Sequence, residues 1–241
     1  MNVANAHDVQ ALLKTADQFR MSSDNLQVET QVNSRKADGS ADKERRYTVF
    51  AQAGRKSLVL MQSPADKGQK VLMLGDDFWL LMPASQRPMR ITPMQKLLGD
   101  ASTGDIATLS WAGDYSGTLV GTEPCATDGM PVAAGGPQTC QHLSLEAARK
   151  GVTYQRIELW LGQDRHEPVR ADLYVQSDKL AKQARFVMDA AAAPTQVQEM
   201  VLIDRLGNGK QTVIRYLGRK PRTVPAEWLN PMFLSQNPAL D

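Results

Sequence analysis

Three histidines, His7, His142 and His166, are the only imidazole bases that the 241-residue chain offers for catalysis. Serine hydrolases place their nucleophile in a G-x-S-x-G turn, whereas the nearest stretch here, Gly113–Gly117, has its serine one position late. Scattered imidazoles without a nucleophile and an orienting acid at a recognisable spacing do not make a catalytic triad. The sequence therefore predicts a protein that has no catalytic residues and is not an enzyme.

Motifs for metal ions and phosphate groups are also incomplete. His166-Glu167 lacks the second histidine of a zinc-protease helix. Gly207–Lys210 resembles a phosphate-binding loop, but Gln211 replaces the required Ser or Thr and Asp204 stands where the first glycine belongs. An Asn-Gly hairpin turn explains this stretch better. We therefore expect no metal site and no cofactor.

Two cysteines bear on the cellular compartment. Cys125 and Cys140 lie in one stretch rich in Pro and Gly, without the four ligands of a zinc site or the C-x-x-C of a redox motif. We expect a structural disulfide between them, with two free thiols as the alternative. A disulfide indicates an oxidising compartment, either the periplasm or the outside of the cell. Because residues 1–16 contain Asp8, Lys14 and no apolar core, we expect a mature chain from which a signal peptide has been removed.

Composition excludes two classes of partner. Net charge is only +2, which is too small to argue for a nucleic-acid surface, so we expect no nucleic acid among the partners. Mean hydropathy is −0.38. The longest apolar runs, Val71–Leu74 and Phe78–Met82, are far shorter than the ~18 residues that a membrane-spanning helix needs. The sequence predicts a soluble, globular protein.

Apolar periodicity predicts mainly strands. A helix is expected over residues 5–19, where Val9, Leu12, Leu13, Ala16 and Phe19 follow helical spacing. A second, short helix is expected over residues 93–98 between Thr92 and Gly99, and a helical turn over residues 105–111. Runs with strand character are residues 26–32, 47–53, 57–61, 70–74, 78–82, 152–161, 169–175, 183–188, 195–203 and 211–217.

About ten antiparallel strands with two helices indicate an α+β fold that is mainly β. A sheet of this length must curl, and its concave face then needs covering by the helices. We find no internal repeat and no convincing linker, so we expect a single domain over residues 1–241. The chain also contains 11 methionines, whose flexible side chains suit an adaptable apolar surface. Composition alone favours a filled core over an open cavity.

Several stretches resemble the outer-membrane lipoprotein-sorting protein family, the relatives of LolA and LolB. The resemblance runs from about residue 7 to residue 237, and it is carried by the order and spacing of several motifs. These motifs are Val71–Pro83, Arg90–Pro93, Leu97–Asp100, Gly104–Ala107, Gly113–Tyr115, Tyr154–Trp160 and Trp228–Leu234.

The resemblance implies a strongly curved, incomplete antiparallel β-barrel whose helices lie over its mouth, and it favours an open cavity. It further implies a carrier in the periplasm of Gram-negative bacteria that binds an acyl chain of a lipoprotein or lipid. Such a carrier would work with an inner-membrane transporter or exporter and deliver its ligand toward the outer membrane or the exporter. The alternative within the same fold is a periplasmic sensor that binds lipid or a membrane partner such as an anti-sigma factor.

Strand alternation suggests which residues would line such a cavity, although either face of each strand can turn inward. In the strand at residues 78–82, one face carries Phe78, Leu80 and Met82. The other face carries Trp79 and Leu81, which are the alternative lining residues. The expected lining and lid residues are Leu58, Leu60, Leu72, Leu74, Phe78, Trp79, Leu80, Met82, Met94, Leu97 and Leu98.

Overall fold

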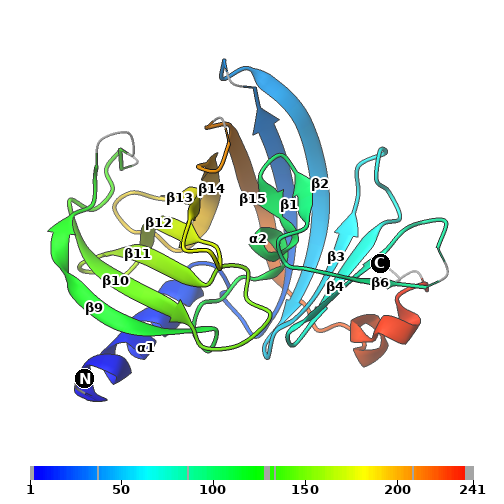
Figure 1. Ribbon diagram of the computed structural model, residues 1–241, viewed down its shortest axis with the longest axis horizontal. Coiled ribbons are helices and arrows are strands. Elements are labelled where there is room, and N and C mark those ends of the chain that lie inside the picture. Colours follow the sequence, from blue (N-terminus) through cyan, green and yellow to red (C-terminus); the bar gives the residue numbers. More distant parts are fainter. Residues whose placement is uncertain are drawn as a thin grey trace.

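The structure is a computed structural model that describes residues 3–36, 38–85, 87–127, 131–132, 134–207 and 209–236, with side chains from Asp8 onward (Figure 1). Its helices are α1 Val3–Gln18, α2 Thr103–Ala107 and the 3-10 helices η1 Ala226–Leu229 and η2 Pro231–Phe233. Its strands are β1 Asn25–Arg35, β2 Ala41–Gln52, β3 Lys56–Met61, β4 Lys70–Leu74, β5 Asp77–Leu81, β6 Met89–Ile91, β7 Lys96–Leu98, β8 Ala101–Ser102, β9 Tyr115–Pro124, β10 Thr139–Ala147, β11 Arg156–Gly162, β12 Pro168–Tyr174, β13 Leu180–Met188, β14 Val197–Asp204 and β15 Gln211–Pro221.

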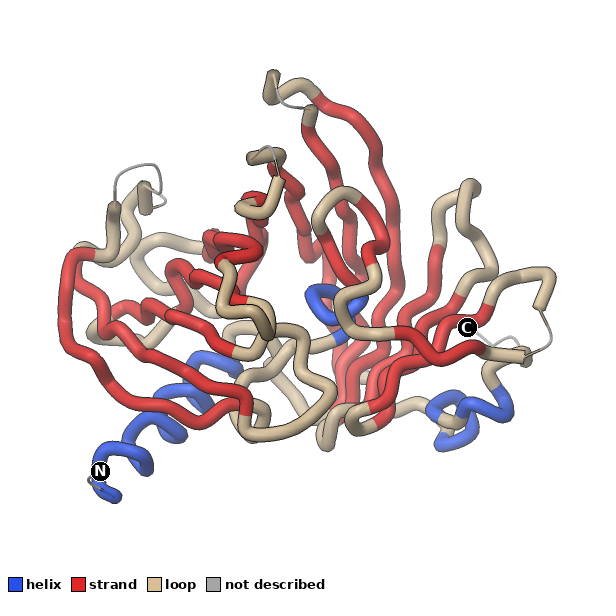
Figure 2. The backbone as a smooth tube through the Cα atoms, viewed as in Figure 1, coloured by secondary structure: helices blue, strands red, loops and turns tan. Residues whose placement is uncertain are grey.

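Thirteen strands in these described ranges form one antiparallel sheet in the order β6-β5-β4-β3-β2-β1-β15-β14-β13-β12-β11-β10-β9. The first and last strands of the chain, β1 and β15, pair in the middle of the sheet. Register shifts, such as the one between Glu29 and Thr30, bend the strands. The sheet curves strongly, but its edges β6 and β9 stay apart (Figures 1 and 2). The expected curved, incomplete barrel is confirmed.

The two faces of this sheet have different coverings. We call the face against which α2 packs the concave face, and the opposite one the convex face (Figure 1). Helix α1 contributes to the same apolar cluster as α2, because Val9, Leu13 and Ala16 lie on one side of it and are fully buried. The helix expected over residues 5–19 is therefore confirmed. No helix among the described residues has both the length and the apolar character required to cross a membrane.

The helix expected over residues 93–98 is wrong. Residues 92–95 form a turn, and Lys96–Leu98 pairs as β7 with β8 in a separate two-stranded hairpin. Six residues are too few for a helix to form on capping signals alone. Gly99 sits at a φ of +56° in the hairpin turn, which explains the glycine without a helix end. The helical turn expected farther on is present as α2, although it begins at Thr103.

Strands β9 and β10 escape a prediction from sequence. In β9, Gly117, Gly121 and three threonine or serine residues leave little apolar alternation. Its partner β10 is identified as a strand only from its pairing with β9, which includes the pairs from Leu143–Leu119 to Ala147–Tyr115. All the strands that the sequence does predict are present, with ends that differ by a few residues. Strands β14 and β15 pair as the expected antiparallel neighbours.

Candidate functional site

The apolar residues expected to line one cavity lie on opposite faces of the sheet. Leu58 pairs with Leu72 and Leu72 with Trp79, and these three side chains share a cluster on the convex face. Phe78 points the other way into the concave cluster, because successive side chains of a strand alternate. Of the expected residues, Leu58, Leu60, Leu72, Leu74 and Trp79 lie on the convex side, Phe78, Leu80, Met94, Leu97 and Leu98 lie on the concave side, and the half-buried Met82 follows the end of β5.

The convex cluster is closed by the C-terminal segment. Leu229 and Leu234 pack onto it, and Leu72 beneath them is fully buried. The Lys70 ammonium group holds this cover in place by donating to the carbonyl oxygens of Leu234 at 2.9 Å and Gln236 at 2.5 Å. Burial lowers the pKa of Lys70. This side of the sheet is a filled core, so we place the candidate site on the concave face.

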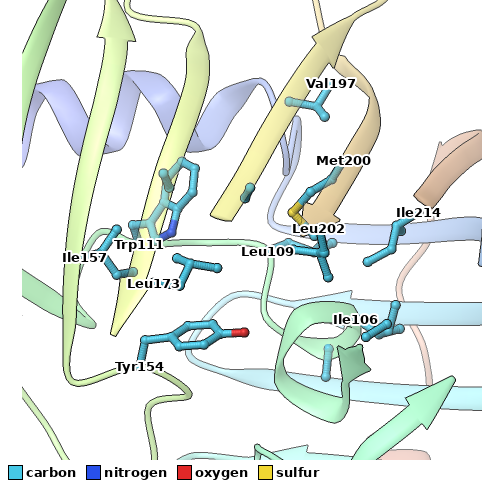
Figure 3. Packing of buried hydrophobic residues seen from close by; sticks show 14 of the residues in the cluster. Ile106, Leu109, Trp111, Tyr154, Ile157, Leu173, Val197, Met200, Leu202 and Ile214 are labelled. Atoms are coloured by element: carbon cyan, nitrogen blue, oxygen red, sulfur yellow. The ribbon is translucent and has the colours of Figure 1, made fainter. Parts of the chain in front are cut away.

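Residues 103–114, which we name the plug, occupy the concave face. They comprise α2 and the chain that follows it, and Ile106, Leu109 and Trp111 are all at most 6% exposed. Figure 3 shows these three side chains among residues of the surrounding strands, including Met200 and Leu202 of β14. The local sequence starts the helix here because Ser102 and Asp105 form a reciprocal capping box.

A buried ion pair ties the start of the plug to the sheet. The Asp105 carboxylate lies 2.6 Å from the Lys182 ammonium nitrogen on β13, and it also accepts a hydrogen bond from the Tyr154 hydroxyl at 2.8 Å. The side chains of Asp105 and Lys182 are only 4% and 5% exposed. Burial alone would raise the pKa of Asp105, but the charge of Lys182 and the hydrogen bonds from Lys182 and Ser102 lower it overall. Asp105 is therefore ionised in the interior.

A second carboxylate ties the plug to α1. The two oxygens of Asp17 accept hydrogen bonds from the backbone amides of Trp111 at 2.7 Å and Ala112 at 2.8 Å. Burial raises the pKa of Asp17 to about 6, although Arg20 and these amides oppose the rise. At the end of the plug, Arg55 on the β2–β3 turn forms a buried ion pair with Asp114. The plug is thus held by polar contacts along its whole length.

Two adjoining cavities remain beside the plug. A cavity of about 230 Å³ lies between the end of α1, the β2–β3 turn and the plug, and its lining includes Met21, Met73 and Leu109. A smaller one of about 40 Å³ is lined in part by Arg20 and Trp111. Thr108, Ser110 and Asp114 border both. Both are below the 300–1,000 Å³ that is usual for small-molecule sites. A long apolar ligand would fit on this face only if the plug moved.

The sequence alone did not single out the polar residues of this site. Asp17 and Arg20 stand at the end of an apolar helix stripe, and Lys182 interrupts an apolar strand beside Ala181 and Ala184. A charged residue inside an otherwise apolar period is a signal for a buried pair. That signal does not reveal the partner, because Lys182 and Asp105 are 77 residues apart.

The convex face of the other half of the sheet carries the disulfide. Cys125 and Cys140 are bonded and fully buried against Trp160, which confirms the expected bridge. His142 stacks on Trp160 with 4.3 Å between ring centroids, and its Nε2 atom lies 2.8 Å from a carboxylate oxygen of Glu158.

The other two histidines lie apart from this stack. His166 sits in the β11–β12 turn with a φ of 60°, and the side chain of His7 falls outside the described residues. Among the described side chains, no three His, Cys, Asp or Glu residues are grouped as a metal site would require.

Solved structures with the same fold cover almost the whole chain. A LolA superfamily protein from Nitrosomonas europaea matches with a TM-score of 0.78 and 29% identity over 92% of this chain and 96% of that one. A DUF1329 family protein from Desulfovibrio piger matches with a TM-score of 0.72 and 22% identity, over 94% and 97% of the two chains. A Vibrio parahaemolyticus domain named for outer-membrane lipoprotein sorting matches with a TM-score of 0.71 and 16% identity, over 96% and 100%.

Sequence comparisons give a family without an assigned activity. No curated protein matches the chain significantly. One family model, described as "uncharacterized protein"-like, matches residues 53–236, which is about three quarters of the chain. The structural matches confirm the resemblance to the lipoprotein-sorting proteins. The chain therefore belongs to the family that this model describes and has the fold of the LolA superfamily.

Proposed function

We propose that this protein is a periplasmic carrier that holds the acyl chain of a lipoprotein or lipid on its concave face and delivers it toward the outer membrane or a membrane exporter. Residues 1–241 act as one binding unit in this proposal, and an inner-membrane transporter or exporter supplies the ligand. No chemical step is involved. The observation that carries the proposal is the plug, an apolar segment packed on the concave face of a sheet whose fold this chain shares with a LolA superfamily protein.

The composition of the plug supports an exchange with an acyl chain. Ile106, Leu109 and Trp111 bury apolar surface against the strands, but polar ties at Asp17, Asp105 and Asp114 hold the backbone. A bound acyl chain gains about 0.8 kcal/mol for each methylene group that leaves water. In this proposal a bound acyl chain takes the place of the plug side chains against the strands, and the plug side chains return when the ligand leaves.

The Cys125–Cys140 bond supports the periplasm as the compartment, because disulfides persist in oxidising surroundings and are rare in the cytosol. The fold supports the same location, since the matching structures include a LolA superfamily protein and a domain named for outer-membrane lipoprotein sorting.

Two matched leucine variants test the proposal. Leu109 belongs to the plug and lines the larger cavity, while Leu72 is buried on the convex face. Leu109→Ala and Leu72→Ala should each cost about 2–5 kcal/mol of stability. Only Leu109→Ala should also increase the affinity for a fluorescent long-chain fatty-acid probe. The vacated space admits about two further methylene groups, which corresponds to about tenfold.

Probe titration and urea unfolding of both variants give the two readouts. A wild-type protein that binds no acyl probe would refute the carrier proposal. Equal changes of affinity in Leu109→Ala and Leu72→Ala would show that the chain does not bind beside the plug, and would refute the proposed site.

A further inference from the structure

Arg20 is a buried cation whose hydrogen bonding is mostly unused. It is 7% exposed and lines the smaller concave cavity. One nitrogen donates to the carbonyl oxygen of Thr108 at 3.1 Å, and the guanidinium group lies 4.1 Å from the ring centroid of Trp111. A guanidinium group carries five N–H donors. Within the described part of the chain, the other donors of Arg20 have no acceptor.

Lys182 and Arg55, two other buried cations of the concave face, have a counter-ion at contact distance, and Arg20 does not. Lys182 contacts Asp105, and Arg55 contacts Asp114. No carboxylate oxygen of a described residue lies within 4 Å of a nitrogen of Arg20. Asp17 acts on Arg20 only at longer range, and its oxygens are already engaged by the amides of the plug.

A second guanidinium group strengthens the positive field at this place. Arg219 is close enough to Arg20 for the two charges to repel each other, although the charge of Asp189 also acts on Arg219, and its Nε atom is buried without a hydrogen-bond partner. Its other nitrogens donate to Gln196 and to the carbonyl of Val197, not to a carboxylate. A buried charge without a counter-ion in direct contact is costly, and an incoming oxyanion that contacts Arg20 would reduce that cost.

We propose that Arg20, supported by the field of Arg219, binds the anionic headgroup of a single-chain amphiphile, either a carboxylate or a phosphate monoester, whose chain lies beside the plug. The inference rests on the proposed function and adds the chemistry of the headgroup to it. Arginine suits the role because its planar fork matches the oxygens of carboxylates and phosphates. The apolar surface of Met200 and Phe186 adjoins Arg20 in the same cavity, as an amphiphile requires.

Ligands of equal chain length test this selectivity. Decanoate, decyl phosphate and decanol compete at about pH 8 against the uncharged apolar probe N-phenyl-1-naphthylamine, and inorganic phosphate is titrated separately by calorimetry. We expect the wild-type protein to prefer both anionic ligands to decanol by about tenfold, the usual effect of a hydrogen bond to a charged group. Arg20→Gln should abolish this preference, so that both anionic ligands and decanol bind with similar affinity, and Arg20→Lys should retain part of it. Arg219→Gln should reduce it a few-fold.

Arg170 provides a matched control. It is 6% exposed and stacks on the Trp160 ring at 3.4 Å, but it lies on the convex face. Arg170→Gln should therefore leave the preference for anionic ligands unchanged. Equal affinities for all three ligands, or an equal loss in Arg170→Gln, would overturn the headgroup inference while the carrier proposal stands. If inorganic phosphate binds as tightly as decyl phosphate, the alkyl chain contributes nothing to binding, and the inference that the ligand is an amphiphile is overturned. Failure of the probe and every ligand to bind would refute the carrier proposal, and the inference with it.

Discussion

Removing the Lys182 side-chain charge should destabilise the protein strongly at neutral pH. Lys182→Met leaves the Asp105 carboxylate buried, with hydrogen bonds from Tyr154 and Ser102 but without its counter-charge. Breaking a buried ion pair in this way costs about 3–5 kcal/mol. The loss should fall on the plug first, because Asp105 belongs to α2 and Lys182 to the sheet. Urea unfolding at pH 7 measures it.

The loss of stability in Lys182→Met should become smaller as the pH falls. In the wild-type protein the pKa of Asp105 is lowered, so its contribution is present above pH ~4 and is lost only as the pH falls through the folded value. In Lys182→Met, burial dominates and raises the pKa of the same carboxyl group, so protonation relieves the penalty when the pH falls from 7 to 5.

A double variant supplies the control. Lys182→Met combined with Asp105→Asn removes both charges and keeps acceptors and donors of similar shape. It should recover most of the stability, since replacing both partners of a buried pair is often close to neutral. A single-variant loss below about 1 kcal/mol, a loss that does not change with pH, or a double variant as unstable as the single one would refute the reasoning.

Two further variants test the plug and the disulfide. Because the pKa of Asp17 is raised to about 6, its stabilising contribution is present below pH ~4 and is lost as the pH rises through about 6. Between pH 4 and pH 7 the free energy of unfolding should fall by up to about 3 kcal/mol more in the wild type than in Asp17→Asn. Denaturation measurements in which the two proteins show the same pH dependence would contradict this. The pair Cys125→Ala and Cys140→Ala should lower stability by about 3 kcal/mol, as expected for a 15-residue loop. It should leave acyl-probe affinity unchanged, and a large loss of affinity would contradict the placement of the site on the other face.

The curved sheet and the disulfide could be predicted from sequence because their signals are local. Short alternating runs with turns between them specify an antiparallel sheet, and two cysteines in one loop have few alternatives. The inward face of β3 and β4 could not be predicted. Both faces of these strands are buried, one by the plug and one by the C-terminal segment. Apolar residues therefore occupy both faces, and their alternation does not show which face points inward.

The polar part of the candidate site was out of reach for a different reason. Asp105 and Lys182 meet only after β13 has taken its place in the sheet. Arg20 is recognisable as a candidate site only once the structure shows that no carboxylate of a described residue contacts it. Pairings between such distant residues leave no local pattern. The hairpin β7–β8 shows the converse case, in which a strong local helix signal at Thr92 and Pro93 was overridden by pairing with Ala101–Ser102.

The central claim is that an acyl chain binds on the concave face beside the plug. A long-chain fatty acid with a photoreactive diazirine on its alkyl chain, a few carbons from the carboxyl group, tests this directly, with the labelled residues identified by mass spectrometry. The account predicts labels on Trp111, Phe186 and Met200, which surround the smaller cavity. Labels confined to the convex cluster around Leu72 and Trp228, or no specific labelling, would contradict it.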